Sequence, residues 1–435
     1  MDADRRRFWR VLLLIALVAL AVRVTYVFVE KRDGALTGDE LFYNAEANYL
    51  ADGNLFTEPF NPRFGEKGQG LLGTGPAADH PPLTVSFLTP ISFVSDRSEL
   101  AQRLMMTVVG FGTVLAIGVL AFDLAGKRAG WIAAGIAAVY PNLFVNDGLV
   151  MSESLSALLV TLTLLFGYRL LRAPSLRLAL LVGGLCGLAA LTRAELLLLV
   201  PLLAVPAALR ATSIALRERW KLVGAGVAAT VLVLLPWVGY NLARFDEPTF
   251  ISTNDGSALI GSNCEDVYYG DGTGLWAFTC LGESPRGDQS VDSRIWRDRA
   301  FDYIRDHTER VPAVVLARVG RTWSVFRPWD MVDYNVFEGR EEWVTISGLF
   351  LFYPLVVAAI AGGVVLWRRK ATLWPLLVPP VIVTLVSAAT YGQTRFRVPA
   401  EPSLIVLAAI ALAALWTRAS AGRDRPRPAP LPQPR

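Results

Sequence analysis

Long apolar segments constrain the fold of this 435-residue chain more than any other feature. Hydrophobic residues make up 53% of the chain and charged residues 18%, against about 25% charged in soluble domains. About ten apolar runs approach the length that crosses a bilayer, some short enough to be tilted or paired. We therefore predict an all-α polytopic membrane protein with about ten transmembrane helices. The runs are Val11–Val29, Leu104–Phe122, Trp131–Val145, Leu149–Leu171, Leu178–Leu191, Leu196–Leu209, Leu222–Tyr240, Ile346–Trp367, Leu373–Ala389 and Leu404–Trp416.

Basic residues predict how these runs are oriented. Arginines at positions 5–10 precede the first run, and further basic clusters fall at alternate connections, as the positive-inside rule requires. The pattern predicts a cell-membrane protein with both termini in the cytoplasm. Two long loops, the first over residues 30–100 and the second over 243–345, then face outside. The net charge of +4 is small and concentrated at these connections, which argues against nucleic-acid binding.

The first long loop opens with a helix-start pattern. Thr37 followed by Glu40 matches a capping box, and apolar side chains recur every fourth residue from Leu41. This predicts an interfacial helix with Asp39 in its first turn, where the helix dipole keeps a carboxylate ionised. Taken locally, Asp39 and Glu40 equally suit ordinary N-terminal helix positions.

Several charged residues lie at the ends of apolar runs, where a charge in the membrane would cost about 2.5–3.5 kcal/mol. Arg23 lies near the end of the first run, and we expect its side chain to snorkel to the interface. Glu153 opens the fourth run. Arg193 and Glu195 lie between two short runs, where they either contact a substrate or form an ion pair that holds a hairpin.

Arg395 and Arg397 come shortly before Pro399 at the start of the last run. An extended conformation before the proline would place both guanidinium groups on one face, as a phosphate clamp. The alternative is positive charge at a membrane surface, which is unusual for an outer loop. His80, in the sequence His-Pro-Pro-Leu, is a ligand, a substrate contact, or an exposed or structural residue.

The second long loop contains Cys264 and Cys280, on the side expected to be oxidising. We predict a disulfide, which would stabilise a loop of about 15 residues by roughly 3 kcal/mol, with two free thiols as the alternative. The apolar stretch Val311–Phe326 contains Arg318 and Arg321 and is predicted to be an interfacial helix with snorkelling arginines. The Pro- and Arg-rich residues 418–435 are predicted to be a disordered cytoplasmic tail.

These motifs, in this order, resemble the GT-C superfamily of membrane glycosyltransferases, and within it the protein-mannosyltransferase-like group. The similarity covers roughly residues 8–417, so we treat 1–417 as one GT-C-like domain. The matching residues are Gly38-Asp39-Glu40, His80-Pro81-Pro82-Leu83, Arg103, Tyr140-Pro141, Ser152-Glu153, Leu188–Arg193 and Arg395–Pro399.

The resemblance implies transfer of a hexose or pentose from a polyprenyl phosphate to an extracytoplasmic protein, lipid or cell-wall glycan. It implies that Asp39 is the general base, with Glu40 its neighbour. Arg395, Arg397 and Arg193 are then available to the donor phosphate, and His80 and Glu153 to the substrates.

Cofactors and other functions are less constrained. A divalent metal ion can assist at carboxylates such as Asp39 or Glu153, although nothing in the sequence requires one. A lipid-linked-sugar flippase or a secondary transporter is the alternative function. A transporter usually shows two repeated halves, and the chain shows no such repeat.

Overall fold

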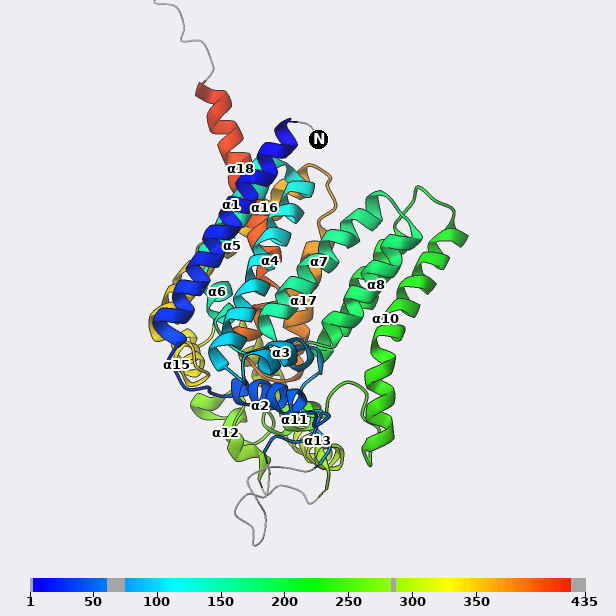
Figure 1. The fold of residues 1–435 in the computed structure, drawn as a ribbon, viewed down its shortest axis with the longest axis vertical. Helices are drawn as coiled ribbons and strands as arrows, with labels where there is room; N and C mark the ends of the chain where they lie inside the picture. The colour runs from blue at the N-terminus through cyan, green and yellow to red at the C-terminus, as the bar shows by residue number, and fades with distance from the viewer. Residues whose placement is uncertain (1–2, 61–74, 283–286, 424–435) are drawn as a thin grey trace, which may run out of the picture.

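The computed structural model describes residues 3–60, 75–282 and 287–423 (Figure 1). Over these ranges the regular elements are all helical. They are α1 (Ala3–Tyr26) with a π turn (Val27–Lys31), α2 (Asp39–Ala51), α3 (Leu83–Val94), α4 (Glu99–Ala125), α5 (Lys127–Val139), α6 (Pro141–Asp147), α7 (Glu153–Arg172), α8 (Leu176–Ala190), η2 (Ala194–Leu198), η3 (Val200–Ala204), α9 (Val205–Leu209), α10 (Leu216–Arg244), α11 (Asn254–Ile260), α12 (Glu265–Tyr268), η4 (Gly270–Gly272), η5 (Phe278–Leu281), α13 (Gln289–Asp306), α14 (Val311–Thr322), α15 (Pro328–Phe337), α16 (Glu342–Arg368), α17 (Trp374–Ala389), η6 (Thr394–Arg397) and α18 (Glu401–Arg423).

The all-helical membrane architecture predicted from the sequence is confirmed. In the described part of the chain, six helices are long and apolar enough to cross a membrane: α1, α4, α7, α10, α16 and α18. Shorter apolar helices, among them α8 and α17, lie between them. The chain is therefore a multi-pass membrane protein, while the number of ten spans stays a prediction.

One predicted span is broken for a local reason. The run Trp131–Val145 divides at Tyr140, whose extended backbone (φ −74°, ψ 118°) ends α5, and Pro141 then begins α6. A proline disfavours helical conformation in the residue before it and suits the first position of a new helix. The short α6 therefore ends with Asn146 and Asp147 buried in the protein.

Small residues set the distances between the main helices. α18 packs against α16, α5 and α4 in the middle of the bundle (Figure 1). A Cβ atom at Gly362 in α16 would lie 1.8 Å from the carbonyl oxygen of Leu407 in α18, so this approach needs a glycine. Helix contacts in membranes rely on such close backbone packing because apolar burial is not available as a driving force.

Arg23 is not at the interface as expected. Its side chain is 1% exposed, and its Nε donates to Oδ2 of Asp147 at 2.6 Å. The carbonyls of Ala137 and Ala138 accept from the other guanidinium nitrogens. The snorkelling prediction was wrong because the sequence gives no sign that Asp147, 124 residues away, faces α1.

The two long loops meet as a cap at the end of the bundle opposite the N-terminus, where α2, α11, α12 and α13 lie (Figure 1). Arg318 and Arg321 of α14 are 4% and 0% exposed, so the prediction of snorkelling side chains was wrong. Arg318 donates to the carbonyl of Ser262 in the second long loop and to that of Ala388 in α17. Arg321 donates to the carbonyl of Thr273, also in the second long loop. Arg318 therefore ties the second long loop to the end of α17, and Arg321 ties α14 to another part of the same loop.

The chain's last segment differs in part from the expected disordered tail. α18 continues as a helix to Arg423, so residues 418–423 are helical. The rest of the predicted tail, residues 424–435, lies outside the described residues.

Candidate functional site

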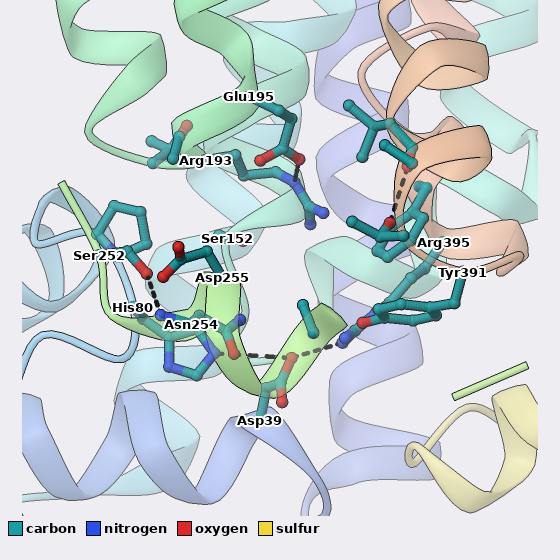
Figure 2. A pocket seen from close by; sticks show the side chains of 18 of the residues that line it. Asp39, His80, Ser152, Arg193, Glu195, Ser252, Asn254, Asp255, Tyr391 and Arg395 are labelled. Carbon is teal, nitrogen blue, oxygen red and sulfur yellow. Dashed lines mark hydrogen bonds and ion pairs between the residues drawn. The ribbon is translucent and has the colours of Figure 1, made fainter. Parts of the chain in front are cut away.

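A cavity of about 320 Å³ lies between the cap and the bundle. Both long loops and the ends of several membrane helices contribute to its walls. Five of the side chains singled out in the sequence line it together: Asp39, His80, Arg193, Glu195 and Arg395 (Figure 2). The cavity therefore joins residues from four distant segments of the chain.

The start of α2 places Asp39 at the cavity by a route other than the expected capping box. Gly38 is the N-cap, with φ at +54°, a conformation that glycine adopts without strain. No side chain caps the helix. Glu40 turns instead into the protein, where it is 1% exposed and accepts from the backbone N–H of Val150 at 2.9 Å. Leu41, in the expected apolar stripe, is exposed, and the buried side of α2 combines Tyr43 and Ala47 with three polar residues, Glu40, Asn44 and Glu46.

Asp39 lies between two cationic side chains (Figure 2). Its Oδ2 accepts from Nη1 of Arg395 at 2.7 Å and lies 3.8 Å from Nε2 of His80. Burial disfavours the charged carboxylate, but Arg395 and His80 outweigh this effect and hold the pKa of Asp39 well below its usual range. Asp39 is therefore ionised at neutral pH and, in this state, a weak base.

His80 is held by residues of both loops. Its Nδ1 lies 2.9 Å from Oδ2 of Asp79, whose other carboxylate oxygen accepts from Gln289 of α13 at 3.1 Å. Burial lowers the pKa of His80, but the Tyr43 side chain and the carboxylates of Asp39 and Asp79 outweigh it, and the pKa is raised well above the usual value. His80 therefore adds positive charge to the cavity.

Two arginines are brought together by a buried carboxylate. Oε1 of Glu153 is 3.2 Å from Nη1 of Arg193 and 3.9 Å from Nε of Arg395. Glu153 itself is 1% exposed and does not line the cavity. Arg193 also donates to Glu195 at 2.7 Å, which is the ion pair considered in the sequence. Glu153 thus lies behind the arginines and fixes their spacing.

Arg397 is placed elsewhere. Residues Thr394–Arg397 form a 3₁₀ helix, η6, so the extended run that would have put Arg395 and Arg397 on one face is wrong. Residues two apart in a 3₁₀ helix point in different directions. Arg397 is buried over the ring of Phe352 and donates to Ser324 at 2.8 Å. The second cavity arginine is Arg193.

Several cavity residues were not anticipated from the sequence. Tyr43, Tyr391 and the second-loop residues Ser252, Asn254 and Asp255 line the same cavity, as does Ser152, which was noted only as part of the Ser152-Glu153 segment. Hydroxyl, amide and single carboxylate side chains are so common in loops that no sequence signal would have selected them. Within the described ranges, no group of three or more His, Cys, Asp or Glu side chains is arranged to hold a metal ion.

Comparisons with known proteins were made for the sequence and for the structure. Residues 79–239 match the model of the family described as dolichyl-phosphate-mannose-protein mannosyltransferase. That match covers fewer than half of the residues. No curated protein matches the sequence.

Several solved structures are similar in fold. The oligosaccharyltransferase AglB from Archaeoglobus fulgidus, in complex with an inhibitory peptide and a dolichol-phosphate, matches at 14% identity and a TM-score of 0.58. The alignment covers 97% of this chain and 52% of that one. The apo form of the Archaeoglobus fulgidus oligosaccharyltransferase matches at 15% identity and a TM-score of 0.57, over 96% of this chain and 51% of that one. ArnT from Cupriavidus metallidurans bound to undecaprenyl phosphate matches at 16% identity over 97% of this chain and 80% of that one, with a TM-score of 0.46. The chain spans about half the length of the oligosaccharyltransferase it matches.

Proposed function

We propose that this chain, which has the GT-C fold of membrane glycosyltransferases, moves a sugar from a polyprenyl phosphate to an acceptor hydroxyl outside the cytoplasm. One observation carries the proposal: a single cavity presents the guanidinium groups of Arg193 and Arg395 beside the carboxylate of Asp39. The family match over residues 79–239 and the fold support the same reaction class.

The arginines suit the donor. A planar guanidinium binds a phosphate through two parallel charge-assisted hydrogen bonds, and two of them can neutralise the charge that develops on a leaving phosphate. Val386 and Ala389 of α17 contribute apolar side chains to the wall of the same cavity. The prenyl chain can follow this apolar side into the membrane while its phosphate stays at Arg193 and Arg395.

Asp39 suits the acceptor. The acceptor oxygen forms a bond to the anomeric carbon while the bond between that carbon and the phosphate oxygen breaks. The acceptor proton passes to Asp39, and the bonding electrons leave with the polyprenyl phosphate. Loss of a general base costs about 10²–10⁴ in rate.

Acceptor binding is assigned to the side of the cavity formed by the second long loop. Ser252, Asn254 and Asp255 offer hydroxyl, amide and carboxylate groups there. Such groups hydrogen-bond hydroxyl-bearing acceptors, which include proteins, lipids and cell-wall glycans.

The test is transfer in proteoliposomes that contain the full chain, radiolabelled polyprenyl-phosphate mannose and a cell-envelope acceptor fraction, with polyprenyl-phosphate arabinose as a second donor. We expect label in the acceptor with the wild-type chain and near-complete loss with Asp39→Asn. Asp52→Asn is the matched control, because it makes the same change at the far end of α2, where Asp52 pairs with the surface residue Arg97. Movement of the lipid across the bilayer without transfer would support a flippase instead.

A further inference from the structure

Arg395 is surrounded by more negative charge than one guanidinium can neutralise. Three carboxylates lie within ion-pair distance of it: Asp39 at 2.7 Å, Glu338 at 3.4 Å and Glu153 at 3.9 Å. The side-chain oxygen of Gln393 also accepts from its Nε at 2.9 Å. A donor phosphate that binds Nη1 of this guanidinium therefore competes with Asp39, which now accepts from that nitrogen.

The three carboxylates differ in how easily they can leave. The side chains of Glu153 and Glu338 are 2% and 10% exposed, and neither lines the cavity. The side chain of Asp39 is 35% exposed and does line it. Moving a buried carboxylate away from its cation would leave an unpaired charge in the protein, whereas Asp39 can turn toward water or toward His80. Asp39 is the partner that an incoming anion replaces.

Arg395 would stay in place after this exchange. Glu338, Glu153 and Gln393 still hold the guanidinium from the side away from the cavity. Glu338 is itself anchored by Arg340, which donates to it at 3.0 Å and to Asn146 of α6 at 3.0 Å. The ion pair between Asp39 and Arg395 is thus not required to position the arginine.

We propose that the donor phosphate releases Asp39 from Arg395, so that this carboxylate becomes a competent base only when the donor is bound. The inference rests on the proposed function and adds a coupling between donor binding and base activation. No covalent bond changes in the exchange: one ion pair of Arg395 is replaced by another.

The charges around Asp39 give the direction of the effect. Arg395 contributes from η6 and His80 from the first long loop. The other titratable groups around them are Tyr43, Tyr391 and Arg193, which line the cavity, and Asp79, Tyr334, Glu338 and Glu153, which lie outside its lining. In the free protein, burial raises the pKa of Asp39, but Arg395 and His80 outweigh burial and the pKa is lowered. A phosphate on Arg395 neutralises that cation and adds a negative charge nearby, so both changes raise the pKa of Asp39. A higher pKa gives a stronger base.

The experiment is equilibrium binding of undecaprenyl phosphate to the full chain in nanodiscs. If the phosphate must displace Asp39, removing its charge should strengthen binding, by about tenfold for one charge-assisted bond. We expect this gain with Asp39→Asn and again with Asp39→Ser, which removes the charge through a different side chain. Thermal unfolding of each variant verifies that it is folded.

Two control variants separate displacement from a general loss of negative charge. Glu338→Gln removes a carboxylate from the same guanidinium, and Asp255→Asn removes one that lines the same cavity without contacting Arg395. Both should gain much less affinity than Asp39→Asn. Unchanged or weaker binding by both Asp39 variants, or equal gains in all variants, would overturn the coupling. Absence of any binding by the wild-type chain would overturn the proposed function together with it, whereas a transfer-active chain without the gain would overturn the coupling alone.

Discussion

At the scale of single residues, the structure separates the two arginines that the sequence had grouped. Arg193 and Arg395 line the cavity, whereas Arg397 is buried against Phe352 and Ser324. Lysine keeps the charge but lacks the planar fork that binds a phosphate. Arg193→Lys and Arg395→Lys should therefore each raise the donor KM by more than about tenfold.

Arg397→Lys provides the matched comparison for these two variants. It should lower thermal stability, because lysine loses the stacking on Phe352, and leave the donor KM close to wild type. A donor titration of the three variants at fixed acceptor measures this. If Arg397→Lys gave the largest change in donor KM of the three variants, Arg397 would be a phosphate contact and the assignment to Arg193 and Arg395 would be wrong.

Glu58, in the first long loop, should make stability depend on pH. Burial, followed by the nearby Asp79 carboxylate, raises the pKa of Glu58 from 4.5 to about 7. The folded state then binds more protons than the unfolded state between these values, so stability falls as the pH rises through that window. Glu58→Gln should raise Tm at pH 8 and have little effect at pH 5. Equal Tm differences at the two pH values would contradict this reading.

Single charged residues could be singled out from the sequence, but their partners could not. Asp39 and Arg395 stand out because charge is scarce in and beside apolar runs, yet their ion pair joins residues 356 positions apart. Glu338, which also holds Arg395, resembles any acidic loop residue in the sequence. Local pattern identifies which residues are costly to place, and only the packed chain shows what each one contacts.

At the scale of elements, features set by local sequence could again be predicted, whereas features set by distant contacts could not. The positions of the long helices follow from apolar length, which is a local property, and they agree with the predicted runs. The conformation of Thr394–Arg397 and the burial of α14 depend on distant loops that pack against them. The sequence rules for extended residues before proline and for snorkelling arginines fail there because tertiary contacts outweigh them.

A disulfide between Cys264 and Cys280, 16 residues apart, crosslinks the second long loop. The loop that it closes contains Gly274, whose carbonyl accepts from the N–H of Gly392 at 2.8 Å, three residues before Arg395. Cys264→Ser with Cys280→Ser should therefore lower stability by about 3 kcal/mol and weaken donor use as well.

Non-reducing peptide mapping of the wild-type chain should recover the two cysteines joined, and thermal unfolding should compare wild type with the double variant. Cys186→Ser is the control, because Cys186 is a buried free thiol in α8. Free thiols at both loop positions in the intact protein would contradict the disulfide.

At the scale of the whole molecule, topology determines whether the cavity can meet a lipid-linked sugar outside the cell. The N-terminus and the end of α18 lie at one end of the bundle, and the cap lies at the other (Figure 1). Basic residues favour the cytoplasmic side, and Arg217, Arg219 and Lys221 lie together at the start of α10. The cap and its cavity are therefore predicted to face outside.

Impermeant thiol labelling of intact cells tests this orientation. The label should modify a cysteine placed at Gly282, an exposed position beside η5 in the cap. A cysteine at Arg217, an exposed position at the start of α10, should react only after the membrane is permeabilised, which also serves as its control for reactivity. Each cysteine is introduced separately into a Cys186→Ser background, so that only the new thiol can react. Labelling at Arg217 in intact cells would reverse the topology, and the cavity would then face the cytoplasm, where an extracytoplasmic acceptor cannot reach Asp39.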